Sequence, residues 1–374
     1  MNQCDPCHGG YSGRLDWRAS LARLAPFSAG SRRTRLTLLG LILLAALPVF
    51  GQYLARIDGD VVRLQDGARR TVVSVMPSRG NNAFEMKVNG KDVIRFPFAS
   101  ADEFKSRGSM SGVPFLAPWA NRLDETAFYA NGKKYTFNLE LGNVRGPNPM
   151  HGLLQTAQWE VVEARADSNS AWVTSRLDFY RQPDWMAQFP FAHTIEMTHR
   201  LQDGVLEVAV KLNNLSAAPM PVAIGFHPYF QVNDAPRDEW TFGIGARTHW
   251  LAKANIPTGE TEPIEKLLPA PQGGSLKGVR LDDGFGDLIR DASGKAVMWV
   301  QGKSERVEVL FGPKYRAAVV WSPGGPNMNF ICFEPMAGIT DSLNLAQKGL
   351  YNELQYLAPG QTWQESFWIR PLGF

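Results

Sequence analysis

Residues 206–212, Leu-Glu-Val-Ala-Val-Lys-Leu, alternate apolar and polar side chains. A period of two predicts a β-strand that buries one side and exposes the other. No window of 12 or more residues after Phe50 keeps the period of a helix. Many short strands without helices between them predict an all-β antiparallel sandwich and not a βαβ fold. The other runs that we predict as strands are 136–141, 171–177, 296–300, 306–311 and 317–321.

The composition is that of a folded, turn-rich protein. The chain has 374 residues, 44% of them hydrophobic and 20% charged, with 35 Gly and 25 Pro, which excludes a disordered or collagen-like chain. The formal net charge is +3, but residues 1–51 carry six Arg against two Asp, and the remainder has 33 basic and 34 acidic residues. The basic charge is therefore confined to the N-terminus, and we expect no nucleic acid as a partner. No repeat or linker follows residue 51, and we predict a single domain over 52–374.

The first 51 residues have the pattern of a leader. Arg32, Arg33 and Arg35 precede an apolar run over 36–50, which ends in Val-Phe-Gly at 49–51. This pattern predicts a secretory signal peptide at about 31–51, and therefore a periplasmic or secreted protein. The apolar run is shorter than the ~20 residues that span a bilayer. An uncleaved membrane anchor or a buried core helix is the alternative, and we expect membrane contact only through this segment if it is not cleaved.

Three cysteines exclude a disulfide-rich scaffold. Cys4, Cys7 and His8 match the C-x-x-C-H pattern of haem attachment. The motif precedes the signal sequence, on the wrong side of the membrane for an exported domain, so we expect no haem. Once the leader is removed Cys332 is the one remaining thiol, and no internal disulfide can form.

Two of the five histidines after the leader have unusual neighbours. His151 lies in Gly-Pro-Asn-Pro-Met-His-Gly at 146–152, which is too rich in Pro and Gly for a strand interior. His227 follows a strand-like run at 221–226 and precedes Pro228, which cannot donate to a β-ladder. Functional groups tend to lie in loops on a rigid sheet. A solvated or hydrogen-bonded structural histidine is the alternative at each position.

Glu334 follows four apolar residues, Phe-Ile-Cys-Phe at 330–333, and precedes Pro335, where we expect the strand to end. A buried carboxylate costs several kcal/mol unless it is paired. Burial also raises the pKa of a carboxyl group toward the range that suits a general base. A salt bridge at the end of the strand is the alternative.

Arg122 and two aspartates are further polar candidates. Arg122 lies close to Trp119, and its fork of donors suits sugar hydroxyls or a surface carboxylate. Asp282 and Asp283 precede Gly284 and have the pattern of an ordinary turn.

These residues lie in motifs whose order and spacing resemble those of the aldose 1-epimerase (galactose mutarotase-like) family. The resemblance covers most of 97–374, and the family fold is a large antiparallel β-supersandwich, in agreement with the strand pattern. The motifs are Pro-x-x-Asn-Arg at 118–122, His-Gly at 151–152, Gly-Phe-His-Pro-Tyr-Phe at 225–230, Leu-Asp-Asp at 281–283 and Cys-Phe-Glu-Pro at 332–335.

The resemblance implies a role for each residue. Glu334 would be the general base that takes the proton from the C1 hydroxyl, and His227 the general acid that protonates the ring oxygen. His151 would hydrogen-bond the ring oxygen or the opening anomeric centre. Sugar hydroxyls would be bound by Arg122, Asn121 and Asp282, with Asp283 as the alternative to Asp282.

The chemistry explains why these residue types are needed. Interconverting α and β anomers requires cleavage of the C1–O5 bond, rotation about C1–C2 and closure on the other face. An acid and a base let the ring open without building full charge, and each contributes roughly 10²–10⁴ in rate. We therefore expect neither a cofactor nor a metal.

The identity of the sugar is open between a free hexose, a hexose phosphate and the reducing end of an oligosaccharide. Gln231 stands where many galactose-type members carry Asn, and the loop at 182–191 offers Trp185 as an aromatic wall for a sugar face. We rank neutral sugars first, because no phosphate clamp is visible beyond Arg122. The sequence predicts no oligomeric state.

Three other functions are alternatives. A non-catalytic carbohydrate-binding module could use the same fold. His151, His227 and Glu334 could form a 2-His-1-carboxylate metal site. Glu334 and Asp282 could be the carboxylate pair of a glycoside hydrolase.

Overall fold

The structure is a computed structural model that describes residues 52–107, 110–144, 146–325 and 328–374. The predicted leader and the C-x-x-C-H motif lie outside these residues. The helices within these ranges are short, and none has both the length and the apolar character that crossing a membrane requires. The three α-helices have six residues each: α1 (Ala101–Ser106), α2 (Pro183–Gln188) and α3 (Ser342–Gln347).

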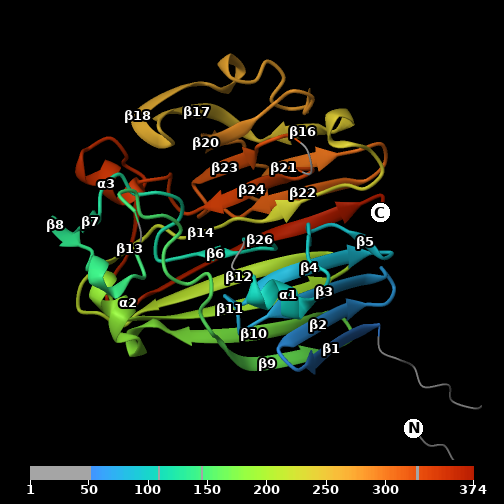
Figure 1. Cartoon of the computed structure of the whole chain (residues 1–374), viewed down its shortest axis with the longest axis horizontal. Coiled ribbons are helices and arrows are strands. Elements are labelled where there is room, and N and C mark those ends of the chain that lie inside the picture. The colour runs from blue at the N-terminus through green and yellow to red at the C-terminus, as the bar shows by residue number, and fades with distance from the viewer. Residues whose placement is uncertain (1–51, 108–109, 145, 326–327) are drawn as a thin grey trace, which may run out of the picture. The chain divides into compact units, whose positions relative to one another are not determined.

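Strands dominate the structure, and the pairs of named strands are antiparallel (Figure 1). The largest sheet has nine strands, in the order β19 (Gly274–Ser275), β16 (Thr241–Ile244), β21 (Ala296–Gln301), β22 (Arg306–Phe311), β26 (Thr362–Leu372), β12 (Val205–Asn214), β11 (His193–Gln202), β10 (Ala171–Asp178) and β9 (Glu160–Ala166).

A second sheet has eight strands. Seven follow the order β18 (Ile256–Pro263), β17 (Ala246–Lys253), β20 (Leu281–Leu288), β23 (Ala317–Ser322), β24 (Ile331–Met336), β14 (Gly225–Phe226) and β6 (Phe115–Leu116), and β15 (Tyr229–Phe230) also pairs with β24.

The first part of the described chain forms a third sheet of five strands. Its order is β1 (Tyr53–Asp58), β2 (Val61–Asp66), β3 (Thr71–Met76), β4 (Asn82–Val88) and β5 (Lys91–Asp92), and two small pairs join β7 (Ala127–Ala130) to β8 (Lys133–Thr136) and β13 (Met220–Val222) to β25 (Gln355–Leu357).

The period of two in residues 206–212 is confirmed by β12. Leu206, Val208 and Val210 are fully buried, whereas Glu207 and Lys211 between them are partly exposed. The predicted strands at 171–177, 296–300, 306–311 and 317–321 are confirmed as β10, β21, β22 and β23. The prediction at 136–141 is wrong: β8 ends at Thr136, and Asn138 caps a 3₁₀ turn by accepting a hydrogen bond from the Glu140 N–H.

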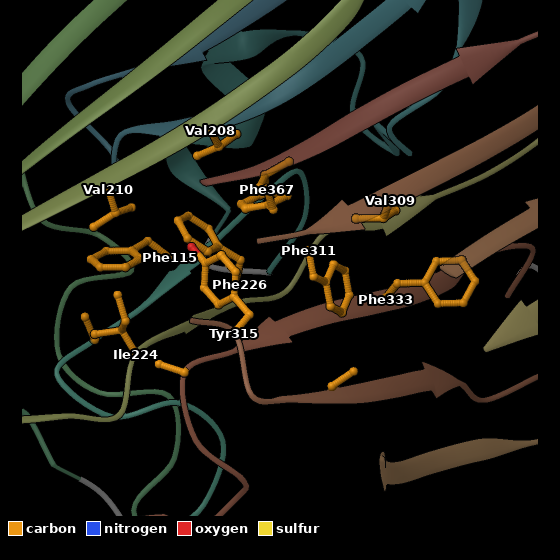
Figure 2. Close-up of a cluster of buried hydrophobic side chains, with 14 of the residues drawn as sticks. Phe115, Val208, Val210, Ile224, Phe226, Val309, Phe311, Tyr315, Phe333 and Phe367 are labelled. Atoms are coloured by element: carbon orange, nitrogen blue, oxygen red, sulfur yellow. The ribbon is translucent and has the colours of Figure 1, made fainter. Parts of the chain in front are cut away.

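The two larger sheets pack face to face through aromatic and branched side chains (Figure 2). Phe367 of β26 meets Phe226 of β14 with 4.8 Å between ring centroids, and Phe226 meets Phe115 of β6 at 5.0 Å. Each fully buried side chain of this size contributes roughly 1.5–3 kcal/mol of hydrophobic free energy. The same core includes Leu64 of β2 and Met197 of β11, so the five-stranded sheet shares it.

Strand β24 is buried on both faces, with all six residues buried. Ile331 and Phe333 belong to the core between the sheets, whereas Cys332 packs with Tyr229, Phe330 and Trp321 on the opposite face. Because side chains alternate along a strand, Glu334 lies on the same face as Cys332. The run of apolar residues before Glu334 reflects this double burial.

Pro335 does not end the strand, contrary to the sequence-based prediction. Strand β24 continues to Met336, with Pro335 opposite Ala318 of β23. On its other side β24 pairs first with β15 and then with β14, and His227 and Pro228 separate these two strands. A proline has no backbone N–H and therefore removes one hydrogen-bond donor from a β-ladder. Here Pro335 lies beside the interruption between β15 and β14.

Candidate active site

The six residues proposed from the sequence line one cavity of about 320 Å³ on the outer face of the eight-stranded sheet. Glu334 comes from β24 and Asp282 from β20, and His227 lies between β14 and β15. The other three, Asn121, Arg122 and His151, come from the segments 117–123 and 149–153. The described residues that line this cavity are these six together with Met110, Met150, Tyr229 and Trp321.

His227 is held against Glu334 by the break in its strand. The His227 N–H donates to the Pro114 carbonyl (3.0 Å), and Pro228 then turns the chain into β15. The imidazole stacks on the Tyr229 ring with 4.9 Å between centroids, and meets Trp321 edge-on at 5.5 Å. Its Nε2 lies 3.2 Å from Oε1 of Glu334. The carboxyl group and the imidazole are thus in direct contact.

Burial determines the protonation of this pair. The side chains of Glu334 and His227 are 1% and 8% exposed. Burial raises the pKa of Glu334 well above its ordinary value, and the nearby charge of Asp282 raises it further. Burial lowers the pKa of His227 to about 3, with smaller contributions from His151 and Arg122. Both shifts disfavour charge, so burial favours the neutral forms of both side chains.

His151 is held by backbone pairing between the two loops. Its N–H donates to the Asn121 carbonyl (2.8 Å), and the Leu153 N–H donates to the Ala117 carbonyl (2.7 Å). The imidazole meets that of His227 edge-on, 5.6 Å between centroids. Burial, together with the nearby charge of Arg122, lowers the pKa of His151 to about 4. Both histidines are therefore neutral near pH 7.

Two non-glycine residues beside the cavity have left-handed backbones, Asn121 at φ +53° and His151 at φ +64°. Such a backbone is strained for a residue with a Cβ and persists only where its surroundings hold it. Asp341 supplies part of that support, because its N–H donates to the Arg122 carbonyl (3.0 Å) and its Oδ1 accepts from the Asp124 N–H (3.1 Å). Arg122 in turn donates from Nη1 to Asn121 Oδ1 at 3.1 Å.

Asp282 and Asp283 lie within β20 and not in a turn, which corrects the sequence-based interpretation. Asp282 is opposite Trp321 of β23, and cross-strand partners share a face. Asp282 therefore reaches the cavity, where its Oδ2 accepts from Asn255 Nδ2 at 2.7 Å. Asp283 points to the other face and bonds through Oδ1 to His249 Nε2 at 3.1 Å.

Comparisons with known proteins agree with this geometry. The sequence profile described as "Aldose 1-epimerase" matches residues 60–370. The chain belongs to the aldose 1-epimerase family.

Relatives of this family member are distant in sequence. It is 23% identical over 251 residues to the uncharacterized protein YphB of Escherichia coli K12. The aligned region covers 66% of this chain and 79% of that protein. Its fold matches a galactose mutarotase-like protein of Clostridium acetobutylicum with a TM-score of 0.73, at 22% identity, covering 86% of this chain and 98% of the other. A galactose 1-epimerase of Lactobacillus acidophilus matches with a TM-score of 0.63, at 16% identity, covering 85% and 97%. The fold is thus the galactose mutarotase-like antiparallel sandwich.

In this aldose 1-epimerase family member, sequence reasoning missed four residues that line the cavity: Met110, Met150, Tyr229 and Trp321. Tyr229 and Trp321 could have been found. Tyr229 stands two positions after His227, and Trp321 is a large aromatic residue at the end of the predicted strand 317–321. No signal in the sequence identifies the two methionines.

Trp185, which the sequence offered as an aromatic wall for a sugar face, is not among the described residues that line this cavity. It lies on α2, packs against Phe179 (5.5 Å between ring centroids) and lines a neighbouring cavity. The metal alternative also lacks support, since no group of three or more His, Cys, Asp or Glu in the described parts of the chain is arranged to hold a metal ion.

Proposed function

We propose that this protein interconverts the α and β anomers of a neutral aldohexose by general acid–base opening and closure of the sugar ring. The observation that supports this most is the Glu334–His227 pair, a buried carboxyl and imidazole 3.2 Å apart on the lining of a cavity. Glu334 Oε2 and His151 Nδ1 are buried and lack a hydrogen-bond partner among the described residues. Buried polar atoms are usually paired, and sugar hydroxyls would pair them.

The proposed cycle begins with a proton shift within the pair. A sugar hydroxyl that donates to Glu334 Oε2 favours the carboxylate, so the proton moves from Glu334 to His227 Nε2. Glu334 then takes the proton of the C1 hydroxyl while His227 gives its proton to the ring oxygen O5. The C1–O5 bond breaks, C1 becomes the aldehyde and O5 a hydroxyl. Rotation about C1–C2 and the reverse transfers close the ring as the other anomer, and the pair regains its original protons.

The remaining residues would orient the sugar. His151 is neutral and can hydrogen-bond the ring oxygen or the opening centre without adding charge. Arg122 forms no ion pair with the described residues, so its free N–H groups can donate to hydroxyls. Asp282 can accept from another hydroxyl. This set has one charged donor, which favours a neutral hexose over a hexose phosphate.

Polarimetry tests the proposal directly. The protein beginning at Gln52 is mixed with fresh α-D-glucose or α-D-galactose, and the optical rotation is followed to equilibrium. Relaxation faster than in buffer, in proportion to protein concentration, is expected with at least one sugar. No acceleration with either sugar, nor with their 6-phosphates, would refute the proposed activity and favour a binding module.

The pH dependence of kcat/KM should lack a histidine step near neutrality. The pKa values of His227 and His151 are lowered to about 3 and about 4, and that of Glu334 is raised. Neither histidine therefore gains a proton near neutral pH. We expect kcat/KM to show no step near pH 6.5 and to fall on the acid side only as the pH approaches the lowered pKa values of the two histidines. An acid limb with its midpoint near 6.5, the ordinary histidine value, would contradict this assignment.

A further inference from the structure

A second and larger cavity lies next to the proposed active site. Its volume is about 680 Å³, against about 320 Å³ for the cavity of Glu334. It is formed by the residues that follow His151 and by the start of α2. Its lining includes Asn143, Gln155, Thr156, Gln158, Gln182 and Trp185.

The two cavities are adjacent along the chain and in space. His151 lines the first, and the next residue, Gly152, lines the second. Gln155 of the second cavity donates through Nε2 to the His151 carbonyl at 3.3 Å. A small cavity of about 20 Å³ adjoins both, because Met110 lines it together with the first cavity, and Gln155 and Thr156 line it together with the second. The two cavities therefore lie close together, near Met110 and Gln155.

The lining of the second cavity suits an uncharged polyol. None of the described residues that line it is charged, so among them it offers no ionic partner to a phosphate or a carboxylate. Amide side chains both donate and accept, as sugar hydroxyls do. Trp185 is only partly buried and offers an indole face for the C–H face of a pyranose ring.

We propose that this second cavity binds a further neutral sugar unit, so that the substrate is an oligosaccharide whose reducing unit occupies the cavity of Glu334. This inference rests on the proposed function. Epimerisation at C1 needs a free hemiacetal there, so the glycosidic bond must leave the reducing unit through another carbon. The chain then continues toward its non-reducing end, past Met110 and Gln155, and its next units stack on Trp185.

The test compares monosaccharides with oligosaccharides that have free reducing ends. Polarimetry gives kcat/KM for glucose and galactose, and for lactose, maltose, cellobiose, maltotriose and cellotriose. At least one oligosaccharide should exceed its monosaccharide by about tenfold, the value of one good stacking contact. Trp185→Ala should remove this advantage and leave kcat/KM for the monosaccharide within about twofold, whereas Trp185→Phe should keep most of it.

Two further variants distinguish a specific loss of sugar binding from a general loss of folding. Gln158→Ala changes an exposed side chain of the cavity and should weaken the oligosaccharide preference alone. Trp172→Ala removes a partly exposed tryptophan of β10, outside the lining of either cavity, and should leave kcat/KM unchanged for monosaccharides and oligosaccharides alike. Oligosaccharides no better than monosaccharides, or an equal loss for both in Trp185→Ala, would overturn the inference.

Calorimetric titration with the same oligosaccharides separates this inference from the proposed function. Binding that Trp185→Ala weakens, without mutarotation of any sugar, would keep the second site and refute the epimerase. Mutarotation of monosaccharides, with oligosaccharide binding unaffected by Trp185→Ala, would keep the epimerase and refute the second site.

Discussion

Glu334→Gln is expected to lower kcat for mutarotation by about 10²–10⁴-fold, the usual contribution of one acid or base. The amide keeps the size of the side chain but cannot take the C1 hydroxyl proton. Burial raises the pKa of Glu334, so at a pH above the ordinary value of that group the carboxyl must take up a proton when the protein folds, and this costs stability. The variant should therefore unfold at the same temperature as the wild type or a higher one. Polarimetry and thermal unfolding measure the two effects.

The matched control is Glu207→Gln, which makes the same change on the partly exposed face of β12. It should alter neither activity nor stability. His227→Asn should cause a loss of the same size as Glu334→Gln, and the double variant should lose little more, because the two residues act as a unit. A Glu334→Gln protein with more than about a tenth of the activity would refute Glu334 as the base.

Gly152→Ala is expected to destabilise the protein by about 2–5 kcal/mol and to lower its activity. Gly152 has φ +66°, which costs a residue with a Cβ about 1–2 kcal/mol. A Cβ at this position would also overlap the backbone carbonyl of Ala117, and such overpacking typically costs another 1–3 kcal/mol. The segment that pairs with Ala117 carries His151, so relief of the overlap displaces an active-site residue. Urea unfolding and polarimetry report the two consequences.

Gly146→Ala, in the same loop, separates the effect of backbone strain from the effect of steric overlap with Ala117. Gly146 has φ +74°, but a Cβ there would meet nothing within 4 Å. This variant should lose only the 1–2 kcal/mol of the left-handed backbone and keep its activity. Equal effects of the two substitutions would show that the contact with Ala117 does not position His151.

The sequence predicted the fold class well, because apolar side chains at every second position show directly which face of a strand is buried. Strand β12 alternates strictly, and β10 and β21 do so as well. The prediction failed at 136–141, where the side chain of Asn138 competes with the ladder for the backbone. It also failed at Pro335, since only the tertiary structure shows that the neighbouring strand is interrupted there.

The sequence predicted which residues form the site better than it predicted how they are arranged in space. The six residues named from the motifs line one cavity, but their distances and pKa shifts depend on burial that no local pattern encodes. The position of Asp282 required the register with Trp321, which is a long-range property. The sequence offered Trp185 as an aromatic wall without showing which cavity it lines, and the structure places it in the second cavity.

The double burial of β24 has a consequence for how such a protein can diversify. Ile331 and Phe333 hold the sheets together, while Glu334 faces the cavity from the opposite side of the same strand. A shift of this strand by one position would exchange the two sets of side chains, so selection on stability also fixes the proton-transfer chemistry. Met110, Met150 and Trp185 line the two cavities from outside this strand. Mutational drift and laboratory evolution are therefore free to change which sugar is accepted while the reaction stays the same.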